Sequence, residues 1–313
     1  MRATALYLMA RQHIPFERTA EAMDDLLGVD CSTGFLDNLY SEGADGLVEF
    51  GEAVRDALRC SEVVHFDETP LKVNKKSHWI HVASNEMLTF LHADTTRGKA
   101  AVEAAGVLPS YGGVAVHDRL SMYFDYKDAT HAVCGAHLLR NLASVAVVWN
   151  QTDWATAMSS LLLWMKDAAE AARGADCRRI SEKKLAEYLK RYDAIVASGL
   201  DANPCPPNNR KRDSVERESY NLVCAFRDLK SEITLFASDL RVPFSNNRAE
   251  SDLRMAKLVQ KISGSLRADH GIKRLANVRS YISTAAKHNM NILDVLTALF
   301  EGKPWLPPVS LRI

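Results

Sequence analysis

Glu250, Arg254, Lys257 and Lys261 are spaced by four, three and four positions within Ser245–Lys261, a segment whose pattern predicts a helix. Residues at this spacing share one face of an α-helix. A carboxylate at the head of a row of cations suits a site that holds a cation and a polyanion together, and a divalent metal on DNA is such a pair. A solvated helix face with a Glu–Arg ion pair at i,i+4 gives the same pattern, so other residues must decide between these interpretations.

Two further carboxylates follow short apolar runs that predict strands. Asp67 ends the run Glu62–Asp67, and Asp118 ends the run Gly113–Asp118. Open α/β sheets place ligand groups at strand ends, and two neighbouring carboxylates repel each other unless a cation lies between them. Each aspartate alone is also explained as a cap or a turn former. A glycosidase that uses the two aspartates as an acid/base pair is another interpretation, although it has no use for a basic helix.

With Glu250 brought to the same sheet edge, the three acids would form an all-oxygen metal site. Such ligands favour Mg²⁺ or Mn²⁺. Two ions of this kind stabilise the attacking and the leaving oxygen of an in-line phosphoryl displacement. We therefore predict that Asp67, Asp118 and Glu250 are catalytic metal ligands.

The charge of the 313-residue chain is balanced overall but unevenly distributed. Its formal net charge is zero, yet residues 241–290 hold ten Lys/Arg and three Asp/Glu, a local charge of +7. A local basic surface of this kind matters more for phosphate contact than the total. The six cysteines form no CxxC pair, which argues against a zinc ribbon. No apolar run reaches the ~20 residues of a membrane span, and we expect a cytoplasmic protein.

The hydrophobic pattern divides the chain into four predicted parts. Residues 1–60 are helical, with a turn and a helix cap that fit either a helix-turn-helix or any αα-hairpin. Residues 61–149 alternate strands and helices, and residues 150–240 form an all-helical block. Residues 241–313 contain the Glu250 helix and C-terminal helices. We expect an α/β fold with a mixed sheet flanked by helices, a large helical insertion and a helical N-terminal segment.

Several motifs occur in an order that resembles the DDE transposases of the insertion-sequence-66 family, from near residue 5 to Trp305. They are Asp67-Glu-Thr-Pro, His117-Asp118-Arg-Leu-Ser-Met-Tyr123, Cys134-Gly-Ala-His137-Leu-Leu-Arg140, Asn246-Asn-Arg-Ala-Glu250, Arg279-Ser-Tyr-Ile-Ser-Thr-Ala and Phe300-Glu-Gly-Lys-Pro-Trp305. Each motif is weakly specific by itself, whereas their order over most of the chain is strongly specific.

The resemblance implies an RNase H-like catalytic domain interrupted by a helical insertion. It implies Mg²⁺-dependent cleavage at transposon ends, followed by attack of the freed 3′-hydroxyl on target DNA, in a bacterial cytoplasm. DNA would be the partner, with a homo-oligomer assembled on it and accessory proteins of the same element. The expected DNA-binding residues are Arg254, Lys257, Lys261, His137, Arg140 and Arg248.

Members of this family usually carry a Cys-rich zinc module and a coiled-coil segment before the part that this sequence resembles. Neither segment is recognisable in the sequence. We therefore expect a truncated copy with its catalytic acids intact and its recognition of transposon ends in doubt. A non-catalytic DNA-binding relic that represses transposition is the alternative.

Overall fold

The computed structural model describes residues 1–148, 152–177, 179–207, 215–263 and 269–308. The chain forms two compact units. The first unit comprises Met1–Ala115, Ser121–Ala129 and Asn247–Ile313, and the second comprises Val116–Leu120 and Thr130–Asn246.

A five-stranded mixed sheet has the strand order β3-β2-β1-β4-β5. The strands are β1 (Val63–Val73), β2 (Lys76–Ser84), β3 (Thr89–Asp94), β4 (Val114–His117) and β5 (Thr130–Val133). Strands β1, β2 and β3 pair antiparallel, with Asp67 opposite Val82 and Val82 opposite Leu91. This α/β fold confirms the predicted class and is consistent with an RNase H-like domain flanked by helical regions.

Strand β1 is longer than the sequence pattern predicts. The expected strand ended at Asp67, but β1 continues to Val73 and pairs with β2 along its length. Pro70 interrupts the strand pattern, because it cannot donate a hydrogen bond. Proline is tolerated in a strand where its backbone nitrogen faces no neighbouring strand. Asp67 therefore lies inside a strand rather than at its end, whereas Asp118 directly follows β4 as predicted.

The first 60 residues are helical, as predicted, but the first helix is not continuous. The helices are α1 (Arg2–Leu6), the π-helix η1 (Tyr7–Arg11), α2 (Phe16–Leu27), α3 (Thr33–Asp45) and α4 (Val48–Arg59). Pro15 occupies the N-cap of α2, and the chain before it cannot continue as helix because a proline disfavours helical backbone in the residue that precedes it. Ser32 caps α3 by accepting a hydrogen bond from Phe35 N at 3.1 Å, as the sequence predicted.

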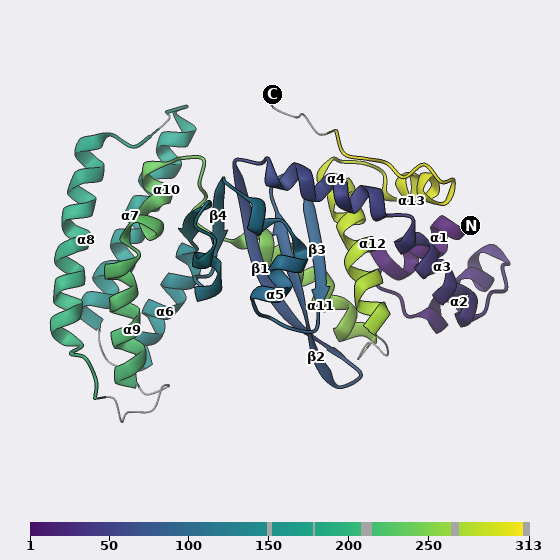
Figure 1. The fold of residues 1–313 in the computed structure, drawn as a ribbon, viewed down its shortest axis with the longest axis horizontal. Helices are drawn as coiled ribbons and strands as arrows, with labels where there is room; N and C mark the ends of the chain where they lie inside the picture. The colour runs from purple at the N-terminus through teal and green to yellow at the C-terminus, as the bar shows by residue number, and fades with distance from the viewer. Residues whose placement is uncertain (149–151, 178, 208–214, 264–268, 309–313) are drawn as a thin grey trace. The chain divides into compact units, whose positions relative to one another are not determined.

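Helices cover both faces of the antiparallel part of the sheet (Figure 1). Helices α11 (Asn247–Ser263) and α12 (Asp269–Lys287) pack on one face. On the other face lie α5 (Lys99–Ala105) and the 3-10 turns η2 (Leu108–Ser110) and η3 (Ser121–Asp125). Helix α13 (Ile292–Phe300) packs against α1 and α12, which joins the C-terminal helices to the N-terminal segment.

The second unit is built mainly from helices. They are α6 (Gly135–Val148), α7 (Thr152–Gly174), α8 (Glu182–Ala202), α9 (Val215–Asp228) and α10 (Lys230–Ser238). Its core includes Trp154, Tyr192 and Phe226, whose rings pack at 6.1–6.5 Å, and the hydroxyl of Tyr192 donates to Phe226 O at 2.7 Å. Helices therefore fill the predicted helical block, while the domain limits remain a prediction. No described helix is both long enough and apolar enough to cross a membrane.

Gly113, just before β4, has no room for a side chain. A Cβ at this position would lie 2.7 Å from the backbone oxygen of Ser61. We expect Gly113→Ala to lower the free energy of unfolding by about 1–3 kcal/mol, because the strand entry must shift to relieve the overlap. Gly112→Ala is the control, since the nearest atom to its Cβ is 4.0 Å away. Equal denaturation midpoints for the two variants would contradict this packing.

Candidate active site

Glu250 and the three cations that follow it lie on α11, as predicted. Glu250 is in the first turn and is half-buried. Arg254, Lys257 and Lys261 are all exposed, whereas Ala249, Leu253 and Ala256 face the sheet and are buried. The helix therefore buries its apolar stripe and presents an exposed basic stripe behind a carboxylate.

Two contacts fix the direction in which α11 crosses the sheet. Near its start, Asp252 forms an ion pair with Lys287 at 2.8 Å. The Nζ of Lys287 also donates hydrogen bonds to Asn85 O and Leu88 O at the β2–β3 turn. Near its end, Gln260 Oε1 accepts a hydrogen bond from Lys72 N at 3.4 Å, beside the β1–β2 turn. Helix α11 therefore runs from the end of the sheet where β1 begins towards the end where β1 finishes.

This direction places Glu250 level with Asp67 along β1. Side chains alternate between the faces of a strand, so Asp67 shares a face with Leu71 and Val73, which pack in one core cluster with residues of α11. From Gln260 back to Glu250 the helix covers about 15 Å, and from Lys72 back to Asp67 the strand covers about 17 Å. Asp67 and Glu250 thus lie on the same side of the sheet and at a similar position along the direction of β1.

Asp118 lies at a bend of the chain in the second unit. Its Oδ1 accepts a hydrogen bond from Leu120 N at 3.0 Å. Arg119 between them has φ +79°, a left-handed conformation that is uncommon outside glycine. No other hydrogen bond to Asp118 is present among the described residues. The bend therefore holds the aspartate through one of its two carboxylate oxygens.

His117 stabilises this bend through a hydrogen bond to its backbone. It is fully buried, and its Nδ1 accepts a hydrogen bond from Arg119 N at 3.1 Å. That bond places the ring proton on Nε2, which donates to His131 Nδ1 at 3.1 Å. Burial, together with the neighbouring His131, lowers the pKa of His117 to about 3. The ring is therefore a neutral support for the backbone and not an acid or base at neutral pH.

Glu68 has a structural role that the sequence did not reveal. Its side chain is fully buried on the sheet face opposite Asp67, and it pairs with Arg97 at 2.7 Å. Tyr123, the aromatic residue of the Asp118 motif, donates its hydroxyl to Glu68 Oε2 at 2.5 Å. The guanidinium of Arg97 also lies 5.1 Å from the ring of Trp79. Alternation along β1 puts Glu68 on the other face, and its partners are 29 and 55 residues away in the sequence.

Removing the Tyr123 hydroxyl should destabilise the first unit. A hydrogen bond to a buried charged group contributes about 1.5–3 kcal/mol, so we expect Tyr123→Phe to lower the free energy of unfolding by that amount in urea denaturation. Tyr126→Phe is a matched control, because its hydroxyl meets the exposed Glu103 at 3.0 Å. The assignment fails if the two variants lose the same stability.

The remaining predicted DNA contacts occupy different environments. Arg140 is exposed on α6 and His137 is half-buried on the same helix. Arg248 is half-buried, with its Nη2 3.8 Å from Glu86 Oε1. Cys134 is buried, and its sulfur accepts a hydrogen bond from Asn246 N at 3.1 Å.

The basic surface does not extend along α12 as the charge count suggested. Arg279 is only 1% exposed and donates to Ala10 O at 3.1 Å, so it cannot reach DNA. Arg274 pairs with Asp37 of α3 at 2.7 Å. These arginines attach the N-terminal helices to α12, and α3 itself carries no lysine or arginine. Lys273 remains exposed, and Arg267 lies outside the described residues.

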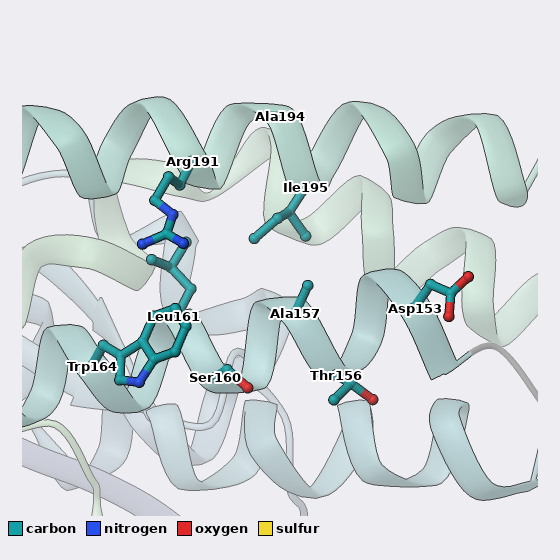
Figure 2. A pocket seen from close by; sticks show the side chains of 9 residues that line it. All are labelled: Asp153, Thr156, Ala157, Ser160, Leu161, Trp164, Arg191, Ala194 and Ile195. Atoms are coloured by element: carbon teal, nitrogen blue, oxygen red, sulfur yellow. The ribbon is translucent and has the colours of Figure 1, made fainter.

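The second unit also has an open groove of about 630 Å³ between α7 and α8 (Figure 2). Arg191 of α8 reaches across it and stacks 5.1 Å from the ring of Trp164 on α7. Trp164 is 48% exposed, whereas Trp154 is buried in the core. The groove is lined by Asp153, Thr156, Ala157, Ser160, Leu161, Trp164, Arg191, Ala194 and Ile195.

Comparison with known proteins agrees with the predicted family. The model of the family described as "Transposase IS66 family" matches residues 1–274. No curated protein sequence matches the chain. The family match covers the segments that carry Asp67, Asp118 and Glu250, together with the whole of α11. The chain belongs to the IS66 family of transposases.

Proposed function

We propose that this transposase cuts DNA at transposon ends and joins the freed 3′-hydroxyl to target DNA, with Asp67, Asp118 and Glu250 as its catalytic triad. The observation that carries the proposal is the placement of Glu250 level with Asp67 on one side of the sheet. Asp118 belongs to the second unit, and its place in the triad comes from the motif that it shares with the family.

The donor set fits a hard divalent cation. All three proposed ligands are carboxylates, and Asp118 has an oxygen without a hydrogen bond among the described residues. Mg²⁺ and Mn²⁺ prefer such oxygen ligands. Two bound ions would supply charge stabilisation for the attacking and leaving oxygens. The chain's own part is to hold the carboxylates on a strand, a bend and a helix that packing keeps in place.

The basic stripe of α11 would guide the DNA backbone past the acids. Arg254, Lys257 and Lys261 are exposed on the helix that carries Glu250. Lysine and arginine bind phosphates without reading sequence, so they position DNA rather than select it. Exposed Arg140 and half-buried His137 and Arg248 would add contacts. We further propose that the protein acts as a homo-oligomer on DNA, with accessory proteins of its element.

Strand cleavage in the presence and absence of metal tests the proposal. End-labelled transposon-end DNA is incubated with the protein in Mg²⁺, in Mn²⁺ and in EDTA, and new breaks are resolved on a denaturing gel. We expect breaks with either metal and none in EDTA. Binding without cleavage under every condition would favour the non-catalytic repressor. Breaks that persist in EDTA would exclude a metal-dependent mechanism.

A further inference from the structure

The turn between β1 and β2 places a lysine where the backbone disfavours it. Val73 pairs with Lys76, so the loop has two residues, Asn74 and Lys75, with φ angles of +47° and +66°. This is the geometry of a type I′ turn, whose second position usually holds glycine. A left-handed backbone is unfavourable for lysine because of its Cβ. A strained residue that the fold tolerates points towards a functional reason for keeping it.

The tip of this hairpin is strongly basic. Lys72, Lys75 and Lys76 are all exposed, and no acid occurs from Leu71 to Trp79. Strand β3 pairs with β2 only as far as Trp79, so the tip extends past the end of β3 (Figure 1). Alternation along the ribbon puts Lys72 and Lys76 on opposite faces. A projecting two-stranded ribbon with cations on both faces suits the backbone of a nucleic acid duplex better than a flat surface would.

The hairpin is joined to the basic stripe of α11. Lys72 N donates to Gln260 Oε1, and Gln260 lies between the exposed Lys257 and Lys261 on α11. No acid occurs from Leu253 to Ser263. The two elements therefore form one basic surface, which we call the α11–hairpin surface and which comprises Lys75, Lys76, Lys257 and Lys261. Lys75 lies eight residues from Asp67, about 26 Å along an extended strand.

We propose that the β1–β2 tip is a second contact for duplex DNA, which binds the phosphate backbone roughly seven to eight base pairs from the site of cleavage. This inference rests on the proposed function, because it takes DNA as the substrate and Asp67 as part of the site. Lysine ammonium groups are point charges that suit phosphates. The tip would therefore increase affinity for DNA of any sequence and hold the duplex in line with α11.

Duplex binding at several salt concentrations tests the proposal. Each neutralised phosphate contributes about 0.9 to the slope of log affinity against log salt, so Lys75→Gln/Lys76→Gln should reduce the slope by roughly 1.8. The matched control is Lys183→Gln/Lys184→Gln, which removes two exposed adjacent lysines of α8 and the same charge. We expect the control to retain the wild-type slope. Equal slopes for the two double variants would overturn the proposal.

Lys75→Gly separates DNA contact from folding. Glycine adopts the left-handed turn without strain, so this variant should melt at or above the wild-type temperature. It should nevertheless bind duplex DNA more weakly and reduce the salt slope by about 0.9. Wild-type affinity in Lys75→Gly would contradict a role of this lysine at the tip.

Lys257→Gln distinguishes a protein that binds DNA without the tip from a protein that does not bind DNA. If Lys257→Gln weakens binding while the tip variants behave as wild type, DNA remains the substrate and the tip proposal is wrong. If wild-type protein does not bind duplex DNA at low salt, both proposals fall.

Discussion

Asp118→Asn is expected to reduce strand cleavage in Mg²⁺ by about 10³-fold while DNA binding is retained. A metal ion contributes several kcal/mol of charge stabilisation to the transition state, and a loss of about 4 kcal/mol corresponds to about 10³-fold in rate. Asparagine has the shape of aspartate and can still accept the hydrogen bond from Leu120 N, so the bend should persist. What is lost is the negative charge that a divalent cation requires.

Cleavage and affinity should be measured on the same labelled transposon-end duplex. Asp128→Asn serves as the control, because Asp128 is an exposed acid ten residues further along the chain. We expect it to cut at the wild-type rate. Asp118→Asn protein that cuts within a few-fold of wild type would remove Asp118 from the proposed triad, and weakened DNA binding would instead indicate a role in holding the substrate.

Acid should destabilise the protein through His13, and His13→Asn should reduce the effect. His13 is only 6% exposed, with φ +59°, and its Nδ1 has no hydrogen-bond partner in the described structure. Burial, with smaller contributions from Arg279 and Arg11, lowers the pKa of His13 to about 4. In the unfolded chain the pKa is about 6.5, so below that pH the unfolded state binds more protons than the native state.

The stabilising contribution of neutral His13 is therefore complete above pH 6.5 and is lost as pH falls towards 4. At pH 5 the loss is about 2 kcal/mol relative to pH 7.5, since each pH unit in this window costs about 1.4 kcal/mol. Asparagine does not titrate and tolerates the left-handed backbone. In urea denaturation at the two pH values, His13→Asn should lose about 2 kcal/mol less than wild type.

Other buried histidines will keep some acid sensitivity in that variant. Burial also lowers the pKa of His117, to about 3, and it lowers the pKa of His81, His92 and His288. His270→Asn is the control, because that side chain is exposed on α12, and it should follow the wild-type profile. An unchanged pH profile in His13→Asn would show that His13 is not the group that protonates on unfolding.

The local sequence pattern predicted which helices and strands occur better than it predicted the residues at which they begin and end. The hairpin of β2 and β3, the short strand before Asp118 and the helix that carries Glu250 follow from alternation and helical spacing. The extension of β1 beyond Asp67 did not, because Pro70 interrupts the strand pattern and only the pairing with β2 shows that the strand continues to Val73. The break before α2 depends on Pro15, because a proline disfavours helical backbone in the residue that precedes it.

The features of the candidate site that the sequence could not predict depend on partners that are distant in the sequence. The exposed basic stripe on α11 was predictable from spacing, but the burial of Arg279 was not, because it depends on a backbone oxygen 269 residues away. The Tyr123–Glu68 hydrogen bond likewise joins two motifs whose contact no local pattern indicates. The turn at Asn74 and Lys75 lacks the glycine that usually marks a two-residue hairpin.

Binding of Mn²⁺, followed by electron paramagnetic resonance, tests most directly the claim that Asp67, Asp118 and Glu250 form one metal site. Wild-type protein is compared with the single variants Asp67→Asn, Asp118→Asn and Glu250→Gln under identical conditions. We expect each substitution to weaken Mn²⁺ binding by about 10-fold or more, because each removes a charged ligand. Wild-type affinity in any of the three variants would contradict a site shared by all three carboxylates.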